Sequence, residues 1–436
     1  MRYFGRLLFA LYFIIGLVGM ISIGSSIFSR LVYFGIIFVF YNWLSSVFSL
    51  NNISLKRQAR SLRASVGDVF EENYEISNTS RISKPFIEII NRSSLLNASG
   101  SKLLTWIGAN EKRRYSARSW LTQRGVFLLG PTELHSGDPF GLFSIRKTIA
   151  AETELLVLPM VIPIDDFANP AGFLPGGNSI ERKSFEITAH ASSIREYFHG
   201  DALKIIHWPT TARKGKLMVK EFDQDPQSEF WIFLDAQQSA HASLPYQIPK
   251  YRDNWIFSTR PELQLPPATI EYAVSLAASL AHFFISKRKA VGLVTEGSQY
   301  TVIPAERSER QEGKILETLA FALGNGKLPL SSIVGLQAAQ MQRGSCAILI
   351  SPAVTNDLLL AIDILQMRKI IPVVLLLAAH SFGGKEGSEA IAKRIEARGV
   401  FVERVYNSSN IREILTKFAE KINASENRIW QNPQLR

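Results

Sequence analysis

The residues best able to do chemistry are concentrated between positions 195 and 222. This stretch combines guanidinium, carboxylate, imidazole and aromatic side chains: Arg195, Glu196, Tyr197, Gly200, Asp201, His207, Trp208, Arg213, Glu221 and Phe222. Six Lys or Arg residues alternate here with three Asp or Glu residues. Such alternation suits a paired polar network better than a site for a free anion. The network either clamps the segment onto neighbouring domains or forms a docking surface for a partner.

His199, Asp201 and His207 within the same stretch also suggest a metal site, because imidazole and carboxylate groups together bind transition metals. Their spacing matches no metalloenzyme motif. A metal-dependent hydrolase that uses these three residues is therefore an alternative to the interaction functions.

No enzyme motif competes with this segment. The chain contains no P-loop, no G-x-S-x-G and no H-E-x-x-H sequence. Its only cysteine, Cys346, begins a predicted buried strand, where a small inert thiol is the usual finding. We therefore expect a protein that is not an enzyme.

After residue 223 the sequence alternates between predicted strands and predicted helices, which is typical of a parallel sheet covered on both faces. The strands are predicted at 230–235, 291–296, 346–351, 371–378 and 400–406, and the helices at 270–287, 308–323, 356–368, 387–398 and 411–422. This is a doubly wound α/β domain. Ligands of such sheets bind beyond the carboxyl ends of the strands, here after Leu234, Val294 and Ile350.

Residues 54–163 show short alternating apolar runs broken by turn residues, which predicts an antiparallel β-sandwich or barrel. Arginines near Tyr115 and Trp120 give this region a basic edge: Arg113, Arg114, Arg118 and Arg124. Basic residues among aromatics suggest nucleic-acid binding, but edge strands also carry charge to prevent self-pairing. We favour the second interpretation and expect no nucleic-acid partner.

The N-terminus contains two uncharged runs, residues 7–28 and 31–50, each about as long as a membrane-spanning helix. A cleaved signal peptide would not be followed at once by a second span. We predict a two-span hairpin that turns at Ser29 and Arg30. The flanking basic residues, Arg2, Arg6, Lys56, Arg57, Arg60 and Arg63, outnumber Arg30 and favour a cell-membrane protein with its N-terminus and main body in the cytoplasm.

Composition agrees with this organisation. The 436-residue chain has a formal net charge of +11, so an anionic partner surface is favoured. The predicted parts are a helical hairpin at 1–50, a sandwich-like domain at 51–165, the charged segment at 166–226, an α/β domain at 227–425 and a tail at 426–436.

The charged segment resembles the signature of the bacterial and archaeal family called domain of unknown function 58. The pattern REY-x-x-GD, I-x-W, AR-x-G-x-L and a basic residue before EF occurs in order between Arg195 and Phe222, and residues 124–143 resemble the stretch that precedes it. The resemblance covers nearly all of residues 1–425. It implies a membrane hairpin, a sandwich-like domain, a von Willebrand factor A-like domain and association with MoxR-type AAA+ ATPases. It implies no established activity.

Folds of von Willebrand factor A type often hold Mg²⁺ through a D-x-S-x-S loop after the first strand. Here Asp235 and Ser239 match that loop, but Gln237 replaces the first serine. Pro352 follows Ser351 where relatives of the fold have an aspartate, so one oxygen ligand is missing. We expect no cofactor, with Mg²⁺ at Asp235 and Ser239 as the alternative. Asp235 then accepts backbone hydrogen bonds at a helix N-terminus.

Residues 241–267 follow as a long loop rich in proline, with Tyr246, Tyr251 and Trp255 as candidate contact residues. Together these features predict a membrane-anchored scaffold or adaptor that works with a MoxR-type AAA+ ATPase in cell-envelope or complex-assembly processes. The alternatives are a module that binds anionic lipid or nucleic acid, and the metal-dependent hydrolase.

Overall fold

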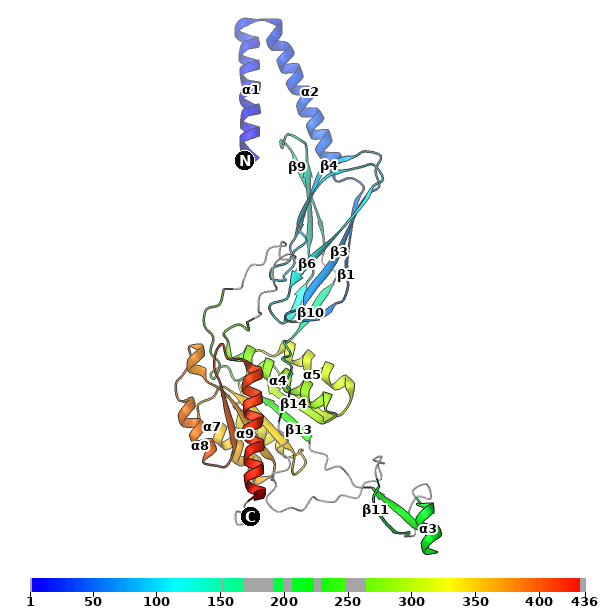
Figure 1. Cartoon of the computed structure of the whole chain (residues 1–436). Coiled ribbons are helices and arrows are strands. Elements are labelled where there is room, and N and C mark those ends of the chain that lie inside the picture. The colour runs from blue at the N-terminus through cyan, green and yellow to red at the C-terminus, as the bar shows by residue number, and fades with distance from the viewer. Residues whose placement is uncertain are drawn as a thin grey trace. The chain divides into compact units, whose positions relative to one another are not determined.

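The structure of the chain, a computed structural model, describes residues 2–150, 153–165, 167, 191–198, 206–222, 229–247 and 264–431. It forms two compact units (Figure 1). The strand-rich unit comprises Met1–Met160 with Gln247–Gln264, and the parallel-sheet unit comprises Val161–Tyr246 with Leu265–Arg436. The predicted multidomain organisation is confirmed.

Two apolar helices open the strand-rich unit, as predicted: α1 (Arg2–Ile23) and α2 (Ser26–Ser49). The Tyr12 hydroxyl on α1 donates to Leu31 O on α2 at 3.1 Å. The predicted turn at Ser29 and Arg30 is wrong, because both residues lie within α2. The chain instead turns at Gly24, whose φ of 65° is left-handed, and the Ser25 side chain caps the next helix.

By length and composition, two of the described helices could cross a membrane: α2 and α4 (Thr269–Ser286). The apolar part of α1 is shorter, at Phe9–Ile23. Of the most apolar stretch of α4, 72% is buried, so α4 is a core helix of the parallel-sheet unit. In α2 the corresponding share is 17%. Helices α1 and α2 therefore keep many exposed apolar side chains.

Ten strands follow α2 in the strand-rich unit: β1 (Ile53–Ala59), β2 (Arg63–Ser65), β3 (Val69–Asn78), β4 (Lys84–Asn91), β5 (Lys102–Ile107), β6 (Lys112–Trp120), β7 (Gly125–Leu128), β8 (Thr132–Gly137), β9 (Ser144–Ile149) and β10 (Glu154–Leu158). They form sheets of order β1-β3-β6, β5-β4-β8-β9 and β2-β10-β7. All strand pairs here are antiparallel except β10 with β2. Ile53, Ile76, Ile87 and Leu134 lie in one core shared by the first two sheets, which is a sandwich-type packing.

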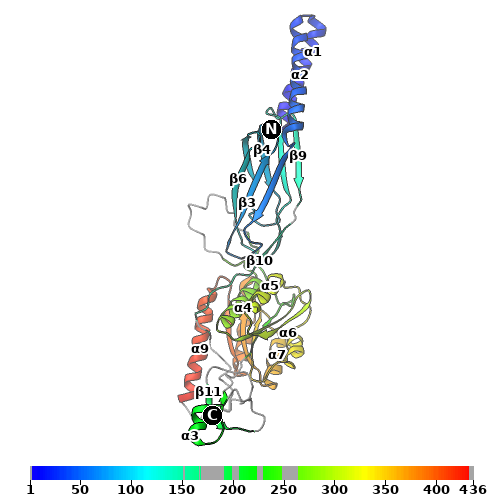
Figure 2. The same ribbon diagram turned by 90° about the vertical axis from the view of Figure 1, so that its right-hand side faces the viewer.

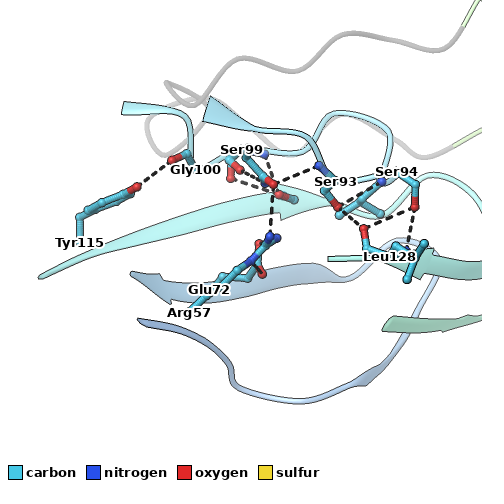
Figure 3. Close-up of polar contacts among 11 residues, drawn as sticks. Arg57, Glu72, Ser93, Ser94, Ser99, Gly100, Tyr115 and Leu128 are labelled. Carbon is cyan, nitrogen blue, oxygen red and sulfur yellow. Dashed lines mark hydrogen bonds and ion pairs between the residues drawn. The ribbon is translucent and has the colours of Figure 1, made fainter. Parts of the chain in front are cut away.

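The strand-rich unit contains a buried charged pair, Arg57 and Glu72, whose side chains are drawn in Figure 3. Arg57 on β1 donates through Nε to Glu72 Oε1 at 2.6 Å and through Nη2 to Glu72 Oε2 at 2.9 Å, a bidentate geometry. The side chains are 13% and 1% exposed. Arg57 was expected to flank the membrane with its basic neighbours, but the carboxylate of Glu72 holds it inside the protein.

The parallel-sheet unit contains a six-stranded sheet of order β15-β14-β13-β16-β17-β18, in which β15 is antiparallel to β14 and the other neighbours are parallel. Its strands are β13 (Glu229–Leu234), β14 (Ala290–Glu296), β15 (Tyr300–Glu306), β16 (Cys346–Ser351), β17 (Ile371–Leu377) and β18 (Phe401–Val405). The five predicted strands are present, and β15 is an additional edge strand.

Helices cover both faces of this sheet, as predicted for a doubly wound fold. Besides α4 they are α5 (Glu309–Phe321), α6 (Leu330–Ala338), α7 (Asn356–Met367), the short 3₁₀ helix η4 (Ala379–Phe382), α8 (Ser388–Glu396) and α9 (Ile411–Gln431). Side chains of α6, α7 and α8 share one core with alternate residues of the strands. Figure 2 shows α9 on one side of the sheet and α6 and α7 on the other. Helix α9 continues into the segment predicted as a tail.

Candidate functional site

The charged segment folds into a hairpin in which a short helix separates two strands. The strands β11 (Ala191–Glu196) and β12 (Met218–Phe222) pair antiparallel, with Arg195 opposite Val219. Helix α3 (Trp208–Lys214) lies between them in the sequence. Two backbone hydrogen bonds follow at the end of the strand pair next to the connecting segment. Tyr197 N donates to Leu217 O at 2.9 Å, and His207 N donates to Met218 O at 2.8 Å. We call β11, α3 and β12 the signature hairpin.

Helix α3 begins and ends at residues suited to those positions. His207 is the N-cap, and its Nδ1 accepts from the Thr210 backbone N–H at 3.3 Å and lies 2.8 Å from Thr210 Oγ1. Pro209 occupies the first turn, where its missing N–H costs nothing. Gly215 ends the helix with a left-handed φ of 63°. One ring nitrogen of His207, a residue proposed as a metal ligand, therefore has a structural use.

Replacing His207 with Ala is expected to destabilise α3 by about 1 kcal/mol, because the N-cap acceptor is lost. Amide hydrogen exchange of residues 206–218 in the full chain measures this, with an expected acceleration of roughly fivefold. Lys214→Ala, at an exposed position in the same helix, is the matched control and should leave exchange nearly unchanged. Equal exchange in His207→Ala and the native chain would contradict the capping role.

The side chains of α3 are turned toward solvent. None of its residues is buried, Trp208 is 65% exposed, and Arg213 is exposed as well. Lys216 pairs with Glu196 at 3.2 Å, and both side chains of that pair are exposed. Trp208 and Arg213 are therefore surface residues of the signature hairpin.

The other signature residues are placed only in part. Arg195, Glu221 and Phe222 lie on the paired strands, and Tyr197 contributes its backbone to the base of the hairpin. Gly200 and Asp201, with His199, lie outside the described residues. Among the residues that are described, no three His, Cys, Asp or Glu side chains form a group that could hold a metal ion.

A second polar centre lies at the carboxyl ends of β13 and β16, where the order of the strands reverses. Asp235 follows β13 and is fully buried. Its Oδ2 accepts from the Ser351 hydroxyl at 2.5 Å, and its Oδ1 accepts from the Gln237 backbone N–H at 3.0 Å. Burial raises the pKa of Asp235 to about 6, and the two donated hydrogen bonds oppose that rise. Ser239 is exposed in the turn that follows.

Neighbouring loops close this centre through further hydrogen bonds. His241 lies with Nε2 2.9 Å from Asp235 O and with Nδ1 2.8 Å from Thr269 Oγ1, and burial lowers the pKa of this imidazole. Gly326 donates its N–H to Ala236 O at 2.8 Å. A side chain at position 326 would meet the Glu296 carbonyl, which explains the glycine. Both oxygens of Asp235 have protein donors, one of them the expected backbone N–H. The expected helix N-terminus is wrong, because residues 238–240 form a turn and the next helix that the structure describes begins at Thr269.

Sequence patterns did not single out His241, Thr269 or Gly326 as partners of this centre. The available signal was a polar residue at the carboxyl end of a parallel strand. Of the residues in this centre, it identified Asp235 and Ser351. Of the loop residues predicted as contacts, Tyr246 is described and exposed, and Tyr251 and Trp255 lie outside the described residues.

The basic edge of the sandwich is neutralised by glutamates. Arg114 and Arg118 on β6 pair with glutamates of the neighbouring strand β3, at 2.5 Å to Glu75 and 3.2 Å to Glu71. Arg113 pairs with Glu111 at 2.7 Å. Strand β6 is the edge of its sheet, so these contacts support the edge interpretation over nucleic-acid binding.

Comparisons with known families point to a class of unknown activity. The family model described as "Protein of unknown function DUF58" matches residues 193–247, which include most of the signature hairpin. A Bacillus subtilis (strain 168) protein, "Uncharacterized protein YeaD", is 21% identical over 308 residues, covering 67% of this chain and 68% of that protein. Both matches support the DUF58 family and carry no statement of activity.

Solved structures give only distant similarities. A pilus adhesin, SpaC from Lactobacillus rhamnosus GG in the open conformation, aligns with a TM-score of 0.30 and 9% identity over 46% of this chain and 30% of the adhesin. A GH20 exo beta-N-acetylglucosaminidase from Vibrio harveyi aligns with a TM-score of 0.18 and 9% identity over 75% of this chain and 57% of that enzyme. At such scores neither similarity carries an argument about fold or function.

Proposed function

We propose that this chain is a membrane-anchored interaction protein whose signature hairpin docks an acidic face of a partner protein. The observation that carries the proposal is the exposed helix α3, which has Trp208 and Arg213 on its surface. An indole and a guanidinium are the side chains that contribute most often to binding energy at protein interfaces. A solvated tryptophan on a seven-residue helix is best explained by a partner that covers it.

The charge of the hairpin defines the partner. Arg213, Lys214 and Lys216 lie at the end of α3 and just after it, and Glu196 pairs with Lys216. An acidic partner surface would complement these groups and accelerate association. Arg113, Arg114 and Arg118 at the sandwich edge already have carboxylate partners, so the hairpin is the better candidate for an anionic protein surface.

The anchor is the N-terminal helix pair. Its apolar surface supports insertion as a two-span hairpin, and Arg2, Arg6, Lys56, Arg60 and Arg63 against Arg30 support a cytoplasmic N-terminus and body. Arg57 adds to this balance even though it pairs with Glu72 in the folded protein, because acidic residues contribute little to the rule. The parallel-rich sheet with helices on both faces is compatible with the von Willebrand factor A type that the family resemblance implies.

The proposed partner is a MoxR-type AAA+ ATPase, which rests on the family resemblance. This chain has no P-loop, so nucleotide hydrolysis would belong to the partner and location to this chain. Of the three residues that the metal-dependent hydrolase would use, His199 and Asp201 lie outside the described residues, and no described residues form a group that could hold a metal ion.

Affinity purification of the full chain from native membranes in mild detergent tests the proposal. We expect an AAA+ ATPase to co-purify, and Trp208→Ala and Arg213→Glu each to weaken its binding about tenfold, the loss usual for one interface anchor. Arg343→Glu, an exposed charge reversal in the parallel-sheet unit, is the matched control and should bind normally.

Two results would contradict the docking surface. The first is recovery of no ATPase from any preparation. The second is equal partner recovery by the native chain and both hairpin variants. Circular dichroism of each variant separates loss of binding from loss of fold, and an Arg213→Glu chain that unfolds would support the clamp instead.

A further inference from the structure

A cavity of about 190 Å³ lies where the last turns of α2 meet the loop that enters β4. Its lining residues include Ser45, Ser83 and Lys84 together with the larger side chains of Tyr41, Phe48 and Ile82. A cavity of roughly 150 Å³ admits a benzene ring, so this one accepts a group as large as a phosphate with adjoining carbons. Both sides of the cavity belong to the strand-rich unit.

Lys84 is the unusual member of this lining, because it is a cation that is only 2% exposed. Its Nζ donates to Phe48 O at 2.6 Å. That neutral carbonyl also accepts from the Asn51 N–H at 3.3 Å. Within the described parts of the chain Lys84 has no carboxylate partner, and burial lowers the pKa of its ammonium group. A buried charge normally has a counter-charge, so the cavity is short of one negative group.

The rim of the cavity is apolar. Tyr41, Phe48 and Ile82 are all exposed, and the first two lie on the final turns of the apolar helix α2. Aromatic side chains at the end of a spanning helix lie at the level of the lipid headgroups. A free inorganic anion would use Lys84 and leave this rim uncovered, whereas an anion with an attached hydrocarbon chain would use both.

We propose that this cavity binds the phosphate of an anionic phospholipid, with Lys84 as the cationic contact and the Ser45 and Ser83 hydroxyls as further donors. The first acyl carbons lie against Tyr41, Phe48 and Ile82. The inference rests on the membrane anchor in the proposed function and is independent of the docking partner. It adds a lipid that fixes the angle at which the sandwich leaves the membrane.

Thermal unfolding of the full chain in a neutral detergent tests this site, with phosphatidylglycerol, phosphatidylcholine or inorganic phosphate added. Phosphatidylglycerol at ten times its Kd is expected to raise the midpoint by about 3 °C, and the other two additions should not. Lys84→Met should lose the shift. Ser45→Phe, which fills the cavity and keeps the Lys84 contact to Phe48, should lose it as well.

Lys112→Met, at an exposed position on β6, is the control for general charge and should keep the shift. An equal shift with inorganic phosphate would overturn the lipid assignment, and an undiminished shift in Ser45→Phe would overturn the cavity. Carbonate extraction of membranes separates this inference from the anchor. A chain that stays in the membrane without preferring phosphatidylglycerol contradicts the lipid site alone, and a chain that is extracted contradicts the anchor too.

Discussion

Replacing Glu72 with Ala is expected to lower the free energy of unfolding of the strand-rich unit by about 3 to 5 kcal/mol, the usual cost of removing one partner from a buried ion pair. The loss is large because Arg57 would keep its charge inside the protein, where its remaining contacts are the Asn91 side chain at 3.2 Å and the Tyr74 ring at 5.3 Å. Urea unfolding and hydrogen exchange of β3 in the full chain measure the effect.

Glu75→Ala is the matched control, since it removes a glutamate from the same strand. Glu75 pairs with Arg114, whose side chain is 76% exposed, so its loss should cost less than about 1 kcal/mol. Removing both charges in Arg57→Met with Glu72→Leu should restore much of the stability, because no charge is then left unpaired. Similar losses of unfolding free energy in Glu72→Ala and Glu75→Ala would contradict a special contribution from the buried Arg57–Glu72 pair.

The second large effect concerns pH. Burial raises the pKa of Asp235 from 3.8 to about 6, so the folded chain holds this proton more tightly than the unfolded chain does. The resulting stabilisation is complete below pH 3.8 and is lost as the pH rises to about 6. A shift of this size corresponds to about 3 kcal/mol in the parallel-sheet unit. Asp235→Asn, which cannot ionise, should not show this loss.

The measurement is the difference between the native chain and Asp235→Asn in urea unfolding at pH 4 and pH 6.5, because the other carboxyl groups cancel in it. Asp165→Asn is the control that should show little change. The Arg412 guanidinium, 2.7 Å from Asp165, lowers the pKa of that exposed carboxyl from 3.8, so its stabilisation is lost mainly below the two pH values compared. If Asp235→Asn and the native chain respond equally to pH, folding does not raise the pKa of Asp235 and our account of its burial is wrong.

Much of the architecture was predictable because it depends on local periodicity. Alternating apolar residues indicated the sandwich, and the alternation of strands and helices indicated the doubly wound sheet. Strand β15 was missed because only Ile303 of its side chains is buried and Pro304 interrupts its pattern, as edge strands allow. Helix α6 was missed because its nine residues carry no charge to mark a polar face.

The turn between α1 and α2 was misplaced for a different reason. Counting uncharged residues favoured the only charge between the runs, Arg30, whereas the chain turns at the glycine that tolerates a left-handed conformation. Arg30 lies within α2 instead. Charge alone therefore does not locate the end of a helix.

The candidate site was predictable in composition but not in exposure. The charged stretch was found from its residues alone, but alternating charge is equally suited to a packed clamp and to a solvated surface. The choice depends on contacts far away in the sequence. Glu72 gave a signal that was not used: it occupies the apolar phase of β3, with Phe70, Tyr74 and Ile76 as its buried neighbours on that face.

The central position of β13 has a consequence for synthesis on the ribosome. Phe230 pairs with Val291 on one side and with Cys346 on the other, so the two halves of the sheet are translated at different times. The residues between Glu306 and Cys346 take roughly 2 to 8 s to synthesise at about 5 to 20 residues per second. During that interval the apolar strand β13 has an open edge able to pair with another nascent chain. Pairing of β16 with β13 therefore closes this edge and protects the first half of the sheet from misassembly.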